Sequence, residues 1–336
     1  MTRTAPGRTA VRFVYAEDVP DPVRRQVEDL MAEWTHLDLR DEVHVRRLAG
    51  GASNVNLALQ TDDAAYALRL CMPESARWGV DRAASIQAQR DAAALGLAPE
   101  VLATRLPEGH YLSRFVEGPV LTHEALRRDG AIPVVARTLR RLNTGSTSGR
   151  RFSPFDDLRT FAEFGFAEQA DYPPDTDDLL AKVLRIEAMF RTRQAPEGFC
   201  HSDCVPGNFL RSSAEYFTLV DFDYAGVGWV AFELASFACQ LALDATETEE
   251  LVTSYDPGAD AGQRARLELM RFVAGVREAM WAYMAEPILG AHTAPADGWT
   301  YRGYAAQNLD QARRAVDCDF DELMHTARTI REGALF

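Results

Sequence analysis

The sequence predicts an α+β chain of two lobes, a small one with an antiparallel sheet plus one helix, followed by a larger, mostly helical one. Three observations lead to this prediction. Short β-prone runs gather before residue 116, segments with helical spacing fill most of the remainder, and one polar motif interrupts the helical part. We therefore assign residues 1–115 to the N-terminal lobe and 116–336 to the C-terminal lobe, with a hinge near Arg114–Gly118.

The N-terminal lobe opens with a loose or strand-forming lead over residues 1–20 and a helix at Pro22–Trp34, whose apolar residues share one face. A second helix over Asp81–Leu95 has Asp81 as its N-cap and Gly96 at its end. Turn-forming residues separate the β-prone runs. Five strands are expected, at Val43–Leu48, Ala52–Leu59, Tyr66–Cys71, Val101–Thr104 and Tyr111–Phe115.

The C-terminal lobe is predicted to be helical except around residues 200–225, where short extended pieces carry the polar motif. None of its apolar runs approaches the roughly 20 residues that a membrane-spanning helix needs. Helices are expected at Leu121–Arg128, Ile132–Leu142, Leu158–Gln169, Thr176–Arg193, Ala231–Leu243, Ala265–Ala285 and Tyr301–Ala315.

Composition narrows the classes of partner. The net charge of −14 opposes sequence-independent nucleic-acid binding, which needs a basic surface. A negative field concentrates small cations near a cleft, although it also serves plain solubility. The five cysteines form no paired framework and no secretory segment is evident, so we expect reduced thiols in a soluble, cytoplasmic protein. The expected partner is a small molecule, without nucleic acid or membrane.

The polar motif begins at Cys200 and reads H-x-D-x-x-x-x-N, with His201, Asp203 and Asn208 as its fixed residues. Asp221 closes an apolar run thirteen residues after the Asn. Kinase-type phosphoryl transfer needs a carboxylate for the hydroxyl proton, and an Asn and an Asp for magnesium on ATP. We predict Asp203 as the catalytic base, Asn208 and Asp221 as magnesium ligands, and a bilobal protein-kinase-like fold.

Two features of the N-terminal lobe suit phosphate binding. The loop that contains Gly50, Gly51, Ser53 and Asn54 joins two strands, where small residues let the backbone approach a phosphate. Taken alone, such a loop also fits an ordinary hairpin. Arg69 lies in an apolar strand and needs an anionic partner, either an ATP phosphate or a structural carboxylate.

Other polar residues have competing interpretations. Asp223, two residues after Asp221, is expected on the same face and would hold a second ion, a water or substrate. His201 is expected to brace the loop by hydrogen bonds to the backbone. Cys200, His201, Asp203 and Cys204 lack the second ligand pair that structural zinc prefers. Several aromatic residues of the helical lobe suit a cage for an ammonium group, but at helical spacing they also fit a core; they are Trp281, Tyr283, Trp299, Tyr301 and Tyr304.

These motifs together resemble the choline/ethanolamine kinases, which are related to the aminoglycoside phosphotransferases. The resemblance covers roughly residues 43–290 and implies that Arg69 binds phosphate. Its remaining elements are Val80-Asp81-Arg82, Gly96–Glu100, Asp221–Gly226 and Phe232–Ala235. It implies an ATP- and Mg²⁺-dependent kinase, with the acceptor bounded by Tyr224, Gln240, Glu278 and Trp281.

The departures from the family concern mainly the acceptor. Ser85 stands where the family often carries a glutamate that pairs with the strand arginine. Gln240 falls where an acidic residue faces choline, and Ser202 replaces the usual Asn of H-N-D. We expect choline or ethanolamine as acceptor, with an amino sugar or aminoglycoside as the alternative. A second alternative is a pseudokinase that binds nucleotide and regulates other proteins.

Overall fold

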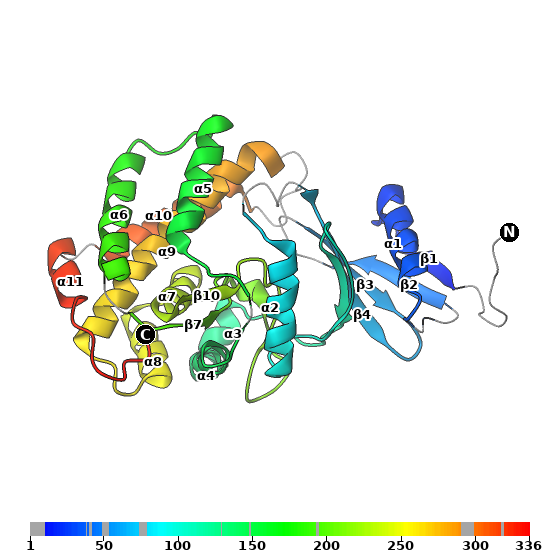
Figure 1. The fold of residues 1–336 in the computed structure, drawn as a ribbon, viewed down its shortest axis with the longest axis horizontal. Helices are drawn as coiled ribbons and strands as arrows, with labels where there is room; N and C mark the ends of the chain where they lie inside the picture. Colours follow the sequence, from blue (N-terminus) through cyan, green and yellow to red (C-terminus); the bar gives the residue numbers. More distant parts are fainter. Residues whose placement is uncertain are drawn as a thin grey trace.

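The computed structural model describes residues 11–37, 39, 42–48, 54–73, 79–128, 130–147, 149–192, 195–289, 299–316 and 319–336. Figure 1 shows two lobes, the N-terminal one around a twisted sheet and the C-terminal one mostly of helices. The predicted fold class is confirmed.

The sheet of the N-terminal lobe has six strands, in the order β1-β2-β3-β4-β6-β5. All neighbouring pairs are antiparallel except β1 and β2, which run parallel. The prediction of five strands was therefore one too few, because part of the lead over residues 1–20 pairs at the edge of the sheet. The strands are β1 (Arg12–Tyr15), β2 (Glu42–Arg47), β3 (Asn54–Gln60), β4 (Ala65–Cys71), β5 (Val101–Arg105) and β6 (His110–Arg114).

An apolar core lies between this sheet and helix α1 (Asp21–Glu33). Val27 and Leu30 of the helix are buried together with Leu57 and Leu68 of the central strands. We call this cluster the N-terminal core; its fully buried members lie between residues 19 and 112. This packing holds β4, the strand that carries Arg69, in place.

Helix α2 (Arg82–Ala94) contributes to a different core. Asp81 caps it by accepting a hydrogen bond from the backbone N–H of Ala84 at 3.0 Å, as its sequence predicts. Ala88 and Ala92 are buried in a large cluster that otherwise consists mainly of residues after 120. We call this cluster the C-terminal core. The helix therefore packs with the C-terminal lobe, although it precedes the last two strands of the sheet.

The C-terminal lobe is organised around the long helix α9 (Ala261–Leu289), which packs against α5, α7 and α10. Short strand pairs β7–β10 and β8–β9 frame the polar motif. Helices α8 and α11 were not predicted. The other elements are α3 (His123–Arg128), α4 (Ile132–Asn143), α5 (Pro154–Ala167), α6 (Thr176–Thr192), β7 (Glu197–Cys200), β8 (Phe209–Leu210), β9 (Thr218–Leu219), β10 (Gly226–Trp229), α7 (Val230–Gln240), α8 (Ala245–Tyr255), α10 (Tyr301–Ala315) and α11 (Phe320–Thr326).

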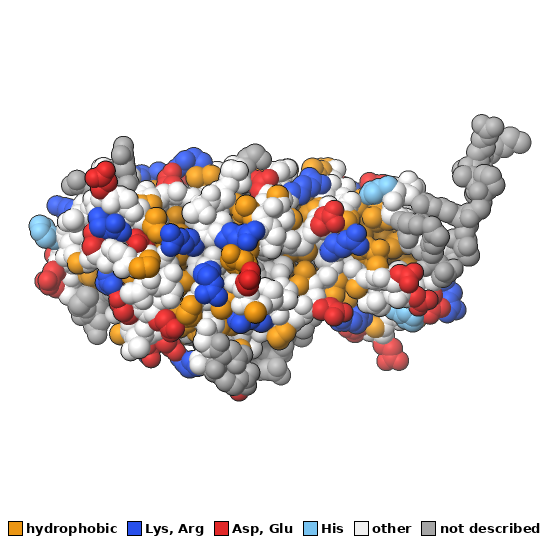
Figure 2. All heavy atoms as spheres, turned by 90° about the horizontal axis from the view of Figure 1, so that it is seen from below, with side chains coloured by type: hydrophobic (Ala, Val, Ile, Leu, Met, Phe, Trp, Pro, Cys, Tyr) orange, Lys and Arg blue, Asp and Glu red, His pale blue; other side chains and the backbone are white. Residues whose placement is uncertain are grey.

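The surface carries charges of both signs, and on the face in Figure 2 acidic and basic side chains are interspersed. Within the described ranges, none of the helices is both long and apolar enough to cross a bilayer. Cys71, Cys200, Cys204 and Cys239 are buried free thiols.

Candidate active site

A cavity of about 750 Å³ is lined by residues from both lobes. Its lining includes Leu48, Ala67 and Ser113, together with Phe115 and Val116 of the predicted hinge. Among the described residues predicted for phosphoryl transfer and for the acceptor, all except Asn54 and Gln240 also line this cavity. Those lining residues are Arg69, Asp203, Asn208, Asp221, Asp223, Tyr224, Glu278 and Trp281.

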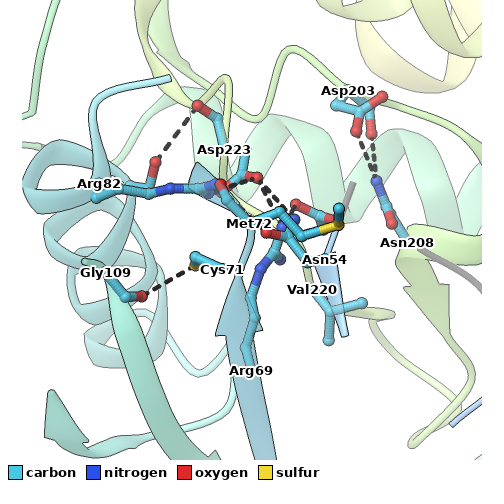
Figure 3. Close-up of polar contacts among 12 residues, drawn as sticks. Asn54, Arg69, Cys71, Met72, Arg82, Gly109, Asp203, Asn208, Val220 and Asp223 are labelled. Carbon is cyan, nitrogen blue, oxygen red and sulfur yellow. Dashed lines mark hydrogen bonds and ion pairs between the residues drawn. The ribbon is translucent and has the colours of Figure 1, made fainter. Parts of the chain in front are cut away.

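Asp203 and Asn208 are hydrogen-bonded to each other within the polar motif. The Asn208 amide nitrogen donates to the backbone oxygen of Asp203 at 2.9 Å and to its carboxylate Oδ2 at 3.1 Å (Figure 3). Asn208 ends a 3₁₀ turn over Pro206–Asn208, which brings it back beside Asp203. Because the amide nitrogen is committed to Asp203, the amide oxygen is the atom suited to a cation.

Glu233 holds the backbone of the loop that carries Asp203. The sequence alone did not assign this residue to the site. Its two carboxylate oxygens accept hydrogen bonds from the backbone N–H groups of His201 and Ser202, each at 2.8 Å. Ser202 has φ of 64°, a left-handed conformation that is strained for Ser. The charge-assisted bonds to Glu233 hold the backbone in that conformation.

His201 is fully buried, and its Nε2 lies 2.9 Å from the carbonyl oxygen of Val220. A nitrogen facing a carbonyl oxygen must donate, so the ring braces the segment that leads to Asp221. Burial lowers the pKa of His201, which favours the neutral ring. This geometry is consistent with the predicted bracing role.

The electrostatic environment of Asp203 is unfavourable to its charge. Burial, and then the negative charges of Glu278 and Asp221, raise the pKa of Asp203 well above the ordinary range of an aspartate. The charge of Arg277 and the hydrogen bond from Asn208 act in the opposite direction. A carboxylate with a raised pKa is a better proton acceptor once ionised, as a general base requires.

Asp221 and Arg69 form an ion pair with 2.9 Å between Asp221 Oδ1 and Arg69 Nη2. Asp221 follows β9 and is in a left-handed conformation, with φ of 67°. Asn208 and Asp221 offer the hard oxygen atoms that Mg²⁺ prefers, so the donors fit this ion. Within the described residues no group of three His, Cys, Asp or Glu side chains is arranged to hold a metal.

Asp223 is occupied by basic side chains. Its Oδ2 accepts hydrogen bonds from Arg69 at 2.6 Å and from Arg82 at 3.1 Å, and from the Asn54 amide at 3.3 Å (Figure 3). Burial opposes its ionisation, but the charges of the two arginines outweigh this and lower its pKa. Asp223 is thus placed as an anchor for guanidinium groups. The anionic partners of Arg69 in this structure are carboxylates.

The glycine-rich loop predicted to bind phosphate lies mostly outside the described residues. Gly50, Gly51 and Ser53 belong to the part that is not described. Asn54 is the first residue of β3 and is buried beside Asp223.

The part of the cavity predicted to hold the acceptor combines carboxylate and aromatic groups. Tyr224, Glu278 and Trp281 line it, as do Trp299 and Tyr304. Trp281 and Trp299 pack around Tyr304, with ring centroids 6.2 and 6.0 Å from it. These rings form an apolar wall beside an acidic group.

Gln240 is the exception among the predicted acceptor residues, because it lies behind the wall and not on it. Its amide donates to Tyr304 Oη at 2.8 Å, and that hydroxyl donates to Glu278 Oε2 at 2.7 Å. Gln240 therefore reaches the cavity through Tyr304. The pKa of Tyr304 is raised by burial and by the charge of Glu278, so the hydroxyl remains a donor.

Arg277 is a lining residue that sequence reasoning missed. Its guanidinium donates to Asp157 at 2.7 and 2.9 Å and to Glu278 at 2.5 Å, and lies 4.4 Å from the centroid of Tyr224. Burial opposes its charge, but Asp157 and Glu278 raise its pKa. With Asp203 included, three carboxyl groups lie near this one guanidinium, and burial raises the pKa of both Asp157 and Asp203.

Comparison with protein families gives one match, to the model described as the phosphotransferase enzyme family, over residues 44–276. Among curated proteins, the probable choline kinase 3 of Arabidopsis thaliana is 24% identical over 163 residues. That alignment covers 46% of this chain and 47% of the plant protein, so it spans about half the length of each.

Solved structures share the fold over most of the chain. A choline/ethanolamine kinase family protein from Mesorhizobium loti matches with a TM-score of 0.74 and 20% identity, covering 91% of this chain and 98% of that one. The choline kinase LicA of Streptococcus pneumoniae matches with a TM-score of 0.71 and 17% identity, covering 87% and 99%. At these identities the similarity demonstrates the fold.

Proposed function

Because the chain belongs to the phosphotransferase enzyme family, we propose that it transfers the γ-phosphoryl group of ATP, with Mg²⁺, to a hydroxyl of a small, amine-bearing molecule. Choline or ethanolamine is the leading acceptor. An amino sugar or aminoglycoside is the alternative, since it also presents a hydroxyl beside a cationic amine. Four buried free cysteines support a reducing compartment, and we propose the cytoplasm.

One observation carries the proposal: the same cavity is lined by the phosphoryl-transfer set and by an acidic, aromatic wall. Asp203, Asn208, Asp221 and Arg69 supply the first. A phosphoryl acceptor must approach both a base and the γ-phosphate, and kinase catalysis depends mainly on positioning and electrostatics. A single cavity meets that requirement.

In the proposed reaction the acceptor hydroxyl oxygen bonds to the γ-phosphorus, and the bond between that phosphorus and the β–γ bridging oxygen breaks. ADP leaves, and Asp203 takes the hydroxyl proton. Arg69 orients phosphate, while Asn208 and Asp221 would hold Mg²⁺. Bound there, the ion neutralises charge on the phosphate oxygens.

The acceptor's positive charge is inferred from the surroundings of Glu278. Three carboxyl groups lie near one guanidinium, and a bound cation would favour their ionised forms. Trp281 and Trp299 add faces that attract ammonium groups, worth about 0.5–2 kcal/mol each. A neutral sugar alcohol would gain neither contribution.

The pseudokinase alternative has weaker support. Ser85 does leave helix α2 without the usual glutamate, but Arg69 is held by Asp221 and Asp223 instead. The catalytic carboxylate is also present and beside Asn208.

The test is a phosphate-transfer screen with Mg-ATP across choline, ethanolamine, amino sugars and aminoglycosides, scored as ADP release that depends on the acceptor. We expect turnover with at least one amine-bearing alcohol, and much less with a neutral alcohol of equal size. Best turnover on an amino sugar would select the alternative acceptor. ATP binding without transfer to any of them would support the pseudokinase.

A further inference from the structure

Arg82, in the first turn of α2, reaches toward the phosphoryl-transfer residues of the C-terminal lobe. Its Nη1 donates to Oδ1 and Oδ2 of Asp223 at 3.2 and 3.1 Å. Its Nη2 donates to Asn54 Oδ1 at 3.3 Å and to the carbonyl of Met72 at 3.4 Å (Figure 3). Arg82 is only 7% exposed, so these contacts form away from water and are stronger than on the surface.

The stem of Arg82 is held by the turn between β5 and β6. Gly109 in this turn has φ of 83°, and a Cβ there would lie 2.6 Å from Arg82 Cγ, too close for any side chain. The carbonyl of Gly109 accepts a hydrogen bond from Cys71 Sγ at 3.1 Å, which ties the turn to β4. The position of the guanidinium is therefore set in advance by the backbone around it.

The two carboxylates of Asp221 and Asp223 are matched by two guanidinium groups only if Arg82 is counted with Arg69. Asp221 and Asp223 are two negative groups, and Arg69 contacts both of them. Without Arg82, these two carboxylates would share one guanidinium in a largely buried place, which is costly. The side chain of Arg82 thus frees Arg69 from neutralising both carboxylates alone.

The two arginines belong to different cores. Arg69 is on β4, whose neighbours Leu68 and Leu70 lie in the N-terminal core. Arg82 begins α2, whose Ala88 and Ala92 lie in the C-terminal core. The pair between Arg82 and Asp223 therefore stays within the C-terminal packing, and the pair between Asp223 and Arg69 joins it to the sheet.

We propose that Arg82 is a positioning residue for Arg69 and acts through Asp223. An arginine on α2 and an aspartate of the C-terminal lobe then do together what a helix glutamate at the position of Ser85 would do alone. This inference rests on the proposed function, because it takes Arg69 to be the group that binds ATP phosphate. It also gives Asp223 an anchoring role in place of the predicted metal ligation.

The test measures ATP affinity by calorimetry, in EDTA and in excess Mg²⁺, for wild type, Arg82→Gln, Asp223→Asn and the double variant. Arg90→Gln, an exposed arginine of the same helix, is the matched control. Loss of a partner that orients a metal-binding side chain typically costs 10–100-fold in metal affinity or activity, and we use that range as a guide for Arg69. We expect each single variant to weaken ATP binding about tenfold or more with and without Mg²⁺. The double variant should lose no more than the worse single, because both act on one group.

Wild-type ATP affinity in Arg82→Gln would overturn the inference. So would an Asp223→Asn defect that excess Mg²⁺ removes, because that result assigns Asp223 to the metal. If Arg82→Gln fails to fold, Arg82→Lys keeps the charge but cannot contact Asp223 and Asn54 together. We expect it to bind ATP measurably more weakly than wild type, and unchanged affinity would again overturn the inference.

A charge relocation gives an independent readout that a merely structural role would not produce. Adding Ser85→Glu to Asp223→Asn restores one carboxylate beside the two arginines, from the helix. Ser85 is suitably placed, since its Oγ lies 3.4 Å from the backbone oxygen of Asp223. We expect partial recovery of ATP affinity. If affinity does not recover, the inference that Arg82 acts on Arg69 through Asp223 is overturned. Failure of wild type to bind ATP at all would instead refute the proposed function.

Discussion

The substitution Asp203→Asn separates the catalytic role of this residue from its effect on stability. Asn has nearly the same shape, and its amide oxygen can accept the hydrogen bond that Asn208 now donates to Asp203 Oδ2 at 3.1 Å. The variant should therefore fold and bind ATP. What it loses is the ability to accept the hydroxyl proton.

The expected loss of turnover is about 10²–10⁴-fold, the usual range for removal of a general base. The free energy of unfolding, by contrast, should increase. Burial and the charges of Glu278 and Asp221 raise the pKa of Asp203, so its ionised form is disfavoured in the folded state. A neutral Asn removes that penalty, worth about 0.5–2 kcal/mol in the free energy of unfolding.

The direction of the pKa shift of Asp203 determines the pH range over which wild type and Asp203→Asn differ in stability. Because the folded-state pKa of Asp203 is raised, its protonated form stabilises the fold below the unfolded-state pKa of about 4. That contribution is lost as pH rises through the raised folded-state pKa. Asp203→Asn should therefore be more stable than wild type near pH 7.5, with the difference vanishing toward pH 4.

The assay pairs steady-state turnover with urea unfolding of wild type and variant at both pH values. Near wild-type turnover would remove Asp203 from the role of base. A variant less stable than wild type at pH 7.5 would show that the surroundings favour the charged carboxylate, contrary to the burial and like charges described.

Three further predictions concern the metal, the acceptor and the loop. Asp221→Ala should keep the fold but remove the gain in ATP affinity that Mg²⁺ provides; calorimetry with and without Mg²⁺ would show an unchanged gain if Asp221 is no ligand. Gln240→Glu adds a carboxylate behind Tyr304 and should raise kcat/KM for choline by roughly fivefold, the effect of about 1 kcal/mol; an unchanged or lower value would remove Gln240 from acceptor recognition. Glu233→Gln leaves one acceptor oxygen for two backbone N–H groups and should lower the free energy of unfolding by about 1.5–3 kcal/mol in urea; a change below 0.5 kcal/mol, roughly that of a surface substitution, would contradict the bracing role.

The candidate phosphoryl-transfer residues could be proposed from the sequence because their signal is local. Asp203 and Asn208 are five residues apart in one loop, a spacing that matches the catalytic loop of protein kinases, and the structure places them in hydrogen-bond contact. Arg69 was recognisable as a charge in an apolar strand. Its partners were not, because Asp223 is 154 residues away and only the fold brings the two together.

Arg277 and Glu233 were not assigned to the site from the sequence, and both lie on helices. Arg277 reaches the cavity from α9, and helical spacing alone does not distinguish a lining residue from a core residue. Glu233 left a weak signal, as the single carboxylate in the otherwise uncharged and fully buried helix α7. A buried charge requires partners, and here these are backbone N–H groups of the catalytic loop.

The edge strand β1 escaped a definite prediction for a related reason. It pairs in parallel with β2, and the segment of sequence that connects the two strands contains the whole of helix α1. Parallel pairing leaves no turn sequence to recognise, whereas the antiparallel strands were separated by turn-forming residues.

The central claim is that an acceptor hydroxyl attacks the γ-phosphate with Asp203 as base. It is tested most directly by mass spectrometry of the product formed from Mg-ATP and an amine-bearing alcohol whose hydroxyl carries ¹⁸O. Attack by that hydroxyl predicts a phosphomonoester that retains the ¹⁸O in its bridging position, absent in EDTA and strongly reduced in Asp203→Asn. Release of inorganic phosphate without labelled phosphoester, or a product yield unaffected by Asp203→Asn, would contradict the account.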